Sequence, residues 1–222
     1  MHLERMNNEQ SMLESVWINA KMLQLMTSSM LQRQRFYSGE SVMALSPLDR
    51  DQLDMMIENL VRLFESYLVR KQMTFRINFE DHFTHCLMAE WELFELFLFH
   101  LISNAAKFSS TGGCISINIL LCQSPETISM KVNVRDTGIG ITDEKLQRIK
   151  VKLASECLPK IMVTRDTTTV PGQDVGFGLS TANMLAQLLG GELTLTSYPW
   201  YKTEGSITFP VKMAPARPKE QK

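Results

Sequence analysis

An acidic residue stands just before a pair of glycines in VRDTGIGI, residues 134–141, which follows an alternating apolar run typical of a half-buried strand. A carboxylate would repel a pyrophosphate, and the third glycine of a dinucleotide-binding loop is missing. Asp136 makes chemical sense opposite a hydrogen-bond donor such as the exocyclic amine of adenine. Gly138 and Gly140 would then let the backbone approach the base, although two such glycines also occur in ordinary turns.

A second stretch, HLISNAAKF at 100–108, carries an imidazole, an amide and an ammonium on one face of an expected helix, at His100, Asn104 and Lys107. An amide oxygen can ligate Mg²⁺, and a lysine can meet phosphate oxygens. The pattern therefore suits the phosphate end of a nucleoside triphosphate. The alternative is a plain helix end, with Lys107 complementing the helix dipole and Asn104 solvated.

A third stretch, VGFGLSTANML, brings glycines directly to the start of an expected helix. Gly176, Phe177 and Gly178 precede amides, at about Leu179 and Ser180, that are free at a helix N-terminus and can cradle a phosphate. A flexible loop that enters a helix is an equally good interpretation of this stretch alone.

Residues 9–34 lack proline and glycine and are predicted to form a helix. Apolar and small residues recur at the spacings of a coiled-coil seam: Leu13, Val16, Ala20, Leu23, Thr27 and Met30. Because other faces also carry apolar residues, we expect this helix to pair with a second copy. A single amphipathic helix packed on its own domain is the alternative.

The rest of the chain predicts a mixed helix and strand unit. A helix is expected from Ser46 as N-cap and Pro47 as first helical residue to about residue 71. The further expected elements are a strand at 74–80, a helix at 90–108, a strand pair at 114–135, an irregular stretch at 142–175, a helix closed by Gly190 and Gly191, and a closing hairpin. The last residues, 214–222, are expected to be disordered.

Composition excludes several classes of function. The 222 residues carry a formal net charge of −1, which gives no reason to expect a nucleic-acid partner. No apolar run approaches the roughly 20 residues needed to cross a bilayer. The four scattered cysteines form no disulfide framework or zinc pattern, although His82, His85 and Cys86 stand close together and are interpreted as a loop surface. A cytoplasmic protein with reduced thiols is expected.

In this order and spacing the three stretches resemble the ATP-binding domain of the GHKL superfamily, most closely that of sensor histidine kinases. HLISNAAKF is similar to the family's asparagine box and DTGIGI to its first glycine box. GFGLS with LAQLLGGELTLTS is similar to its second glycine box and the helix and strand after it. The resemblance runs from about residue 10 to 212. It implies an α+β fold, a two-layer α/β sandwich of the Bergerat type preceded by a dimerisation helix. The implied domains are 1–40 and 41–213.

The resemblance also implies a role for each matching residue. ATP and Mg²⁺ would bind between the asparagine-bearing helix and the glycine boxes. Asp136 would bind the adenine amine, Asn104 would hold Mg²⁺, and Lys107 would contact phosphate. The base pocket would include Gly138, Gly140 and Ile141, and the phosphates would be wrapped by Gly176, Phe177, Gly178, Leu179 and Ser180. Residues 142–175 would form the mobile ATP lid.

The sequence departs from the family pattern in three places. His100 stands where histidine kinases usually carry an asparagine, so it either does similar work or weakens binding of Mg²⁺. The expected lid has no phenylalanine box. Lys160 and Arg165 could still reach phosphate, but we favour their interpretation as solvated charges of the lid. No phosphoacceptor histidine followed by the family's acidic and Leu-Arg-Thr-Pro-like stretch is present.

The leading hypothesis is the catalytic region of a histidine protein kinase, one that starts at the second dimerisation helix of a larger protein and acts on a receiver domain or response regulator. The competing hypothesis is a degenerate, kinase-like module that binds nucleotide or a partner without phosphotransfer. An ATPase clamp of the gyrase or mismatch-repair type is disfavoured, because such proteins use a glutamate where this chain has His100.

Overall fold

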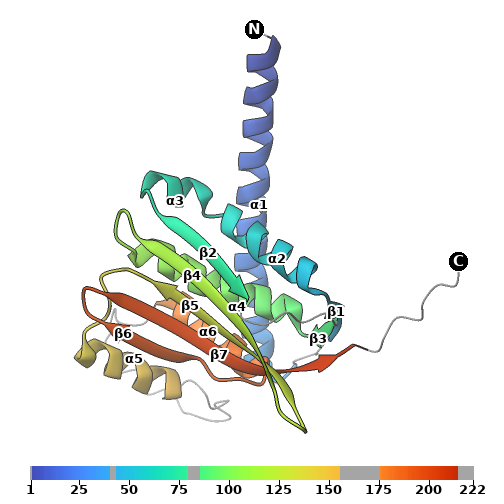
Figure 1. Ribbon diagram of the computed structural model, residues 1–222, viewed down its shortest axis with the longest axis vertical. Helices are drawn as coiled ribbons and strands as arrows, with labels where there is room; N and C mark the ends of the chain where they lie inside the picture. Colours follow the sequence, from blue (N-terminus) through green and yellow to red (C-terminus); the bar gives the residue numbers. More distant parts are fainter. Residues whose placement is uncertain (1, 41–43, 80–85, 156–175, 215–222) are drawn as a thin grey trace, which may run out of the picture.

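The computed structural model describes residues 2–40, 44–79, 86–155 and 176–214, which form two layers and a long projecting helix (Figure 1). In chain order the elements are α1 His2–Ser38, β1 Ser46–Leu48, α2 Arg50–Arg62, α3 Glu65–Arg70, β2 Thr74–Phe79, β3 Leu87–Ala89, α4 Trp91–Phe108, β4 Cys114–Gln123, β5 Ile128–Asp136, α5 Asp143–Ser155, α6 Phe177–Leu188, β6 Thr194–Tyr198 and β7 Lys202–Met213. This arrangement confirms the expected α/β sandwich preceded by an N-terminal helix.

One mixed sheet forms the first layer. Its strands follow the order β1-β3-β7-β5-β4-β2, and β6 pairs with β7. Only the β2–β4 pair is parallel among the described strands; the others are antiparallel. In the middle of the sheet Val134 of β5 pairs with Ile117 on one side and with Gly205 on the other. This register places Asp136, the last residue of the central strand β5, between Ile115 of β4 and Thr203 of β7.

The helical layer packs against one face of the sheet because α4 is apolar on nearly every side. Phe94 and Phe97 of α4 are fully buried, and the Phe94 ring lies 5.4 Å from that of Phe209 on β7. Alternate β4 residues, Ile115, Ile117 and Ile119, point into the same core. The C-terminal half of α4, which carries Asn104 and Lys107, is therefore held rigidly over the sheet.

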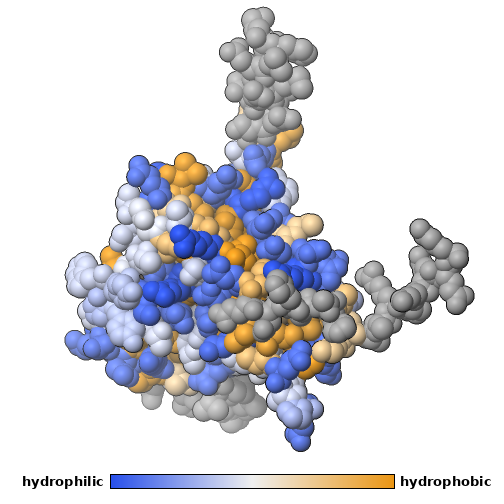
Figure 2. All heavy atoms as spheres, viewed as in Figure 1, coloured by the Kyte–Doolittle hydropathy of each residue, from blue (hydrophilic) through white to orange (hydrophobic). Residues whose placement is uncertain are grey.

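The opposite face of the sheet is open and carries a polar row across five strands. Asn78, Asn118, Asn133, Ser206 and Thr194 stand in register, with Asn78 Nδ2 donating to Asn118 Oδ1 at 2.8 Å. Figure 2 shows this side of the molecule as largely hydrophilic or neutral, with hydrophobic residues in separate areas. The alternation of apolar and polar residues in the strands is thus the consequence of a sheet covered on one side only.

Helix α6 lies beside α4 and ends as the sequence predicts. The amides of Gly190 and Gly191 donate to the carbonyls of Gln187 and Ala186, and Gly190 has the left-handed φ of +79° that this helix ending requires. The short helix is therefore fixed at its C-terminus, while its N-terminus faces the site described below.

Helix α1 packs against the α/β sandwich through one face, and its opposite face is exposed. Leu25 and Ser29 are buried, and Lys21 pairs with Glu95 of α4 at 3.0 Å. The six residues of the expected seam, Leu13, Val16, Ala20, Leu23, Thr27 and Met30, are all exposed. The upper part of α1 extends beyond the sandwich (Figure 1).

The predicted start of the second helix is wrong. Residues 46–48 form strand β1, which pairs with β3, and the N-cap of α2 is Asp49. Its carboxylate accepts from the Gln52 amide at 2.8 Å, while the Gln52 side chain accepts from the Asp49 amide, a complete capping box. Pro47 fits an edge strand, since it lacks the N–H of an interior one. The helix also breaks near Leu63 and Phe64, so α2 and α3 are separate.

The prediction of an irregular stretch at 142–175 is wrong for its first part. Residues 143–155 form α5, whose buried residues Leu146, Ile149 and Leu153 recur at helical spacing. Residues 156–175, with Lys160 and Arg165, lie outside the described part of the chain. So do His82, His85 and nearly all of the C-terminal tail.

Candidate functional site

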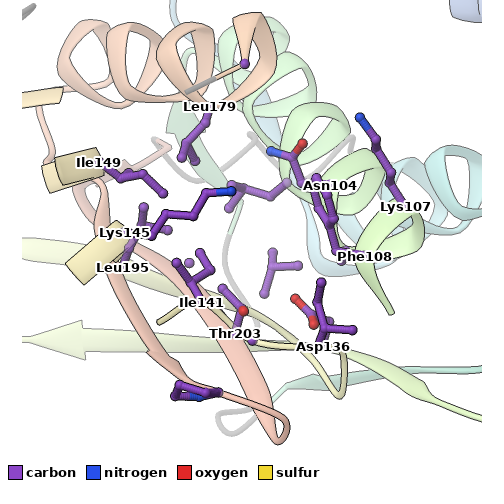
Figure 3. A pocket seen from close by; sticks show the side chains of 18 of the residues that line it. Asn104, Lys107, Phe108, Asp136, Ile141, Lys145, Ile149, Leu179, Leu195 and Thr203 are labelled. Atoms are coloured by element: carbon purple, nitrogen blue, oxygen red, sulfur yellow. The ribbon is translucent and has the colours of Figure 1, made fainter. Parts of the chain in front are cut away.

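A cavity of about 620 Å³ opens between the end of α4, the loop after β5, helix α5 and the start of α6 (Figure 3). Its volume lies in the range of small-molecule sites, and its walls are mostly apolar with a few polar groups. The predicted residues that line it are Asn104, Lys107, Asp136, Gly140, Ile141, Gly176 and Leu179. Residues from three separate sequence stretches are therefore brought to one space.

Asp136 lies at one end of this cavity and is only 7% exposed. Its Oδ1 accepts from the Gly138 amide at 2.8 Å, and the Thr203 backbone provides a second hydrogen bond. Burial raises the pKa of Asp136 to about 6, although both hydrogen bonds act to lower it. A carboxylate has acceptor capacity beyond two bonds, so Asp136 can accept from a neutral N–H donor inside the cavity.

The loop at 137–141 is clamped between α4 and the turn that joins β6 to β7. A Cβ on Gly138 would lie 2.5 Å from the Phe108 carbonyl oxygen, and one on Gly140 would collide with the Tyr198 carbonyl. Gly140 also has a φ of +65°. The Ile141 amide donates to Ser197 Oγ at 2.8 Å. The glycines therefore allow close packing of the loop on its neighbours, a role that the sequence interpretation did not include.

Asn104 and Lys107 stand on the last turns of α4, and this end of the helix has an unusual support. The Lys71 ammonium donates to three carbonyls there, those of Ala106, Lys107 and Ser109, at 3.1, 3.0 and 2.8 Å. A cation at a helix C-terminus satisfies carbonyls without intrahelical partners and complements the dipole. Lys71 thus fixes the turn from which both polar side chains project.

His100 shares the helix with Asn104 but contacts α1 instead of lining the cavity. Its Nε2 lies 2.9 Å from Ser29 Oγ, and both residues are buried. The Ser29 hydroxyl donates its proton to the Leu25 carbonyl at 2.8 Å, so we infer that Nε2 carries the imidazole proton. Burial lowers the pKa of His100 to about 4, which keeps the ring neutral.

The start of α6 provides the third wall. Gly176 is the N-cap, and the first turn, Phe177 to Ser180, contains no acidic residue. The Ser180 amide donates to the Gly176 carbonyl at 3.5 Å, which is the first hydrogen bond within the helix. The free amides are therefore those of Phe177, Gly178 and Leu179, whereas the sequence interpretation placed them at about Leu179 and Ser180. From α1, Arg33 donates to Ser180 Oγ at 3.1 Å. The positive charge of Arg33 and the positive N-terminal end of the α6 dipole lie close together, which favours binding of an anion.

Sequence reasoning missed several lining residues, of which Lys145 is the most polar. It projects from α5, together with Ile149, into the cavity. The other missed residues include Phe108, Thr203 and Trp200. The spacing of Leu146, Ile149 and Leu153 was a signal of an amphipathic helix that could have revealed α5 and hence Lys145.

The described residues contain no cluster of three His, Cys, Asp or Glu side chains that could hold a metal ion. Within the same residues no helix has the length and apolar character of a membrane span.

Comparison with known proteins identifies the family. The model of the histidine kinase-, DNA gyrase B- and HSP90-like ATPases matches residues 91–214, more than half of the chain. The chain belongs to this ATPase family. The matched region includes α4, the loop after β5 and the start of α6, so every wall of the cavity falls within the family domain.

Curated relatives of this family member include histidine kinases. The histidine protein kinase SaeS of Staphylococcus epidermidis is 29% identical over 68% of the chain, and SaeS of Staphylococcus aureus is 30% identical over the same share. A sensor-like histidine kinase of Rhizobium meliloti is 33% identical over 55% of the chain. The chain spans 40% of the length of the SaeS proteins and 21% of the Rhizobium protein.

Solved structures share the fold of the ATPase domain. The catalytic domain of histidine kinase ThkA aligns over 76% of this chain and 96% of its own, with a TM-score of 0.55 and 18% identity. Full-length ShkA, solved in complex with AMPPNP, aligns over 88% of this chain and 37% of its own, with a TM-score of 0.61 and 17% identity. At such identities the likeness concerns the fold.

Proposed function

We propose that this chain is the ATP-binding catalytic region of a histidine protein kinase in a cytoplasmic two-component or phosphorelay pathway. The observation that carries the proposal is the position of buried Asp136 at one end of an apolar cavity, with Asn104 and the start of α6 at the other. Such a cavity offers a base-binding end and a phosphate-binding end. The family of the chain and the names of its relatives agree with this function.

The base end rests on Asp136. Its carboxylate would accept a hydrogen bond from the exocyclic amine of adenine, and Ile141 would pack against the ring. The clamped loop of Gly138 and Gly140 keeps the carboxylate in place, since Gly138 itself donates to Asp136. The apolar walls would exclude water from this hydrogen bond and strengthen it.

The phosphate end rests on α4 and α6. Asn104 would offer its amide oxygen to Mg²⁺, which would supply neutralisation of the negative charge of the phosphates. Lys107, whose ammonium lies 5.1 Å from the centre of the Phe108 ring, would turn into the cavity to contact phosphate from the same helix. The free backbone amides of Phe177, Gly178 and Leu179 would bind the phosphates, in the turn between Gly176 and Ser180. A hypothetical Cβ on Gly178 would lie 3.7 Å from Asn104 Oδ1. The start of α6 and the Asn104 side chain of α4 are therefore close enough to contact the same ligand.

The reaction would be transfer of the γ-phosphoryl group to a histidine supplied by another segment. A bond would form between an imidazole nitrogen and the γ-phosphorus, and the bond to the β-phosphate oxygen would break to release ADP. A neutral imidazole is already a nucleophile and needs no general base. Positioning and charge stabilisation would therefore account for the catalysis.

A specific observation favours a second candidate, a kinase-like regulator that binds nucleotide without phosphotransfer. His100 occupies the position at which a second metal ligand is expected, but its imidazole contacts Ser29. Of the two positions of α4 where the family pattern implies a ligand for Mg²⁺, only that of Asn104 then holds an asparagine. In this case the chain would bind ATP with little dependence on the cation.

The N-terminal residues 1–40 are proposed to form a dimerisation helix ahead of a catalytic domain at 41–213. The exposed seam of α1 supports pairing with a second copy, because residues such as Leu13 and Leu23 are about two thirds exposed in one chain. A receiver domain or response regulator is the proposed partner. Light scattering at micromolar concentration should give the mass of a dimer, and a monomer would contradict the pairing.

Titration of ATP with and without Mg²⁺ tests the proposed function. The unmutated chain should bind ATP more tightly with Mg²⁺, and Asn104→Ala should lose that gain. Asn118→Ala, on the open face of the sheet, is the matched control and should behave as the unmutated chain. No binding of ATP would refute the proposal. Tight binding that ignores Mg²⁺ would instead support the regulator.

A further inference from the structure

Lys145 is the only charged residue on α5 that lines the cavity among those that the structure describes. It lies in the first turns of α5, one turn before Ile149, which lines the cavity as well. The burial of Leu146 and Leu153 fixes the rotation of α5, so this face of the helix is turned to the cavity by packing. The position of Lys145 is therefore determined by the fold.

Lys145 points across the cavity towards Asn104 (Figure 3). Lys107, by contrast, directs its ammonium away from that space, and the ammonium lies 5.1 Å from the centre of the Phe108 ring. Within the described residues, no ion pair joins Lys145 to a carboxylate. In the part of the chain that the structure describes, Lys145 is thus the cation that reaches into the cavity.

The charge of Lys145 is also poorly matched to its own helix. The N-terminal turn of a helix favours acidic side chains, such as the preceding Asp143 and Glu144, and disfavours a cation. An anion bound in the cavity would compensate both this effect and the positive end of α6 opposite. Asp136 does not fill that place, because it accepts backbone hydrogen bonds at the other end of the cavity.

We propose that Lys145 is a phosphate-binding residue of this site, whose ammonium donates to non-bridging oxygens of a nucleoside di- or triphosphate beside Asn104. The proposal rests on the proposed function, since it assumes that a nucleotide occupies the cavity with its base at Asp136. Lysine acts here as a mobile point charge with three donors. It would supply, from the segment after the first glycine box, a cation that the sequence interpretation sought further along, at Lys160 and Arg165.

The test is a titration of adenosine, AMP, ADP and ATP against the full chain and three variants. Lys145→Gln should weaken ADP and ATP about tenfold, as expected for loss of one hydrogen bond between charged groups, and should leave adenosine within about twofold. Lys145→Arg should retain most of the affinity. Lys150→Gln removes an exposed lysine of the same helix that does not line the cavity, and should change nothing.

Two results would overturn the proposal while sparing the proposed function. One is unchanged affinity of Lys145→Gln for ADP and ATP. The other is an equal loss for adenosine and for ATP, which would mean that Lys145 only shapes the cavity. If the unmutated chain binds none of the four ligands, both the proposed function and the role of Lys145 fail together.

Discussion

The imidazole of His100 and the hydroxyl of Ser29 share a buried hydrogen bond of 2.9 Å that joins α4 to the long N-terminal helix. The other ring nitrogen, Nδ1, faces the start of α6, where a Cβ on Gly178 would lie 3.6 Å away. Arg33 adds a second link from α1 to the same region through Ser180. The residue that departs most from the family pattern is therefore part of the contact between α1 and the ATPase domain.

This contact should make the stability of the protein sensitive to pH. Burial lowers the pKa of His100 to about 4, from 6.5 for a free histidine, so between these values the unfolded chain binds the proton more readily. His100 therefore contributes full stability above pH 6.5, and up to about 3 kcal/mol is lost as the pH falls to 4. The free energy of unfolding, measured with denaturant, should fall more steeply with decreasing pH for the unmutated chain than for His100→Asn between pH 6.5 and 4. Parallel pH profiles would contradict the assignment.

Replacement of Asp136 by asparagine should move stability and binding in opposite directions. Because burial raises the pKa of Asp136 to about 6, its contribution to stability is fully present below about pH 3.8 and is lost as the pH rises through 6. Asp136→Asn should thus raise the free energy of unfolding at pH 7 by about 1–3 kcal/mol. ATP affinity should fall at least about tenfold, since the amide is a weaker acceptor for the adenine amine.

The unmutated chain provides the control for Asp136 through its own titration. Its affinity for ATP should decline as the pH falls below about 6, where the carboxyl becomes protonated, while that of Asp136→Asn should stay flat. Calorimetric titration from pH 5 to 8 measures both. A gain in stability together with unchanged ATP binding would show that Asp136 does not contact the nucleotide.

Lys71 should influence the site without touching a ligand. Lys71→Met removes three hydrogen bonds to the end of α4 and leaves the carbonyls of the two part-buried bonds, those of Ala106 and Ser109, without this partner, which should cost about 1–3 kcal/mol of stability. ATP affinity should fall as well, because Asn104 projects from this turn, and Lys71→Arg should restore part of both. Arg70→Met alters the exposed neighbour and should have little effect. Loss of stability with full ATP affinity would limit Lys71 to a structural role.

Sequence patterns predicted most of the strands and the buried helix because their burial is one-sided or complete. Apolar and polar residues alternate in β4 and β5 because helices cover one face of the sheet. The apolar run of α4 reflects its burial on nearly every side. At the start of α2, however, Ser46-Pro47 and Asp49 are both good helix-start signals. The choice between them is made by the pairing of β1 with β3, which local sequence does not encode.

The site was predictable in its motifs but not in its geometry. Helical spacing places His100 and Asn104 on one face, yet only the packing of α1 turns the imidazole to Ser29. The spacing of Leu146, Ile149 and Leu153 could have revealed α5, but not the role of Lys145, since an exposed lysine is ordinary on a surface helix and becomes informative only when α5 is placed beside the cavity. Gly138 and Gly140, by contrast, were recognisable in the sequence as a glycine motif. Their close contacts with the Phe108 and Tyr198 carbonyls became visible only in the fold.

The most direct test of the central claim is the movement of glycine amide signals in nuclear magnetic resonance spectra on addition of ligand. With adenosine, the amides of Gly138 and Gly140 at the base end should shift. With ATP and Mg²⁺, those of Gly176 and Gly178 at the start of α6 should shift in addition. Gly112 and Gly190, outside the cavity, should stay in place with either ligand. Shifts confined to other residues, or none with ATP, would contradict the assignment of this cavity as the ATP site.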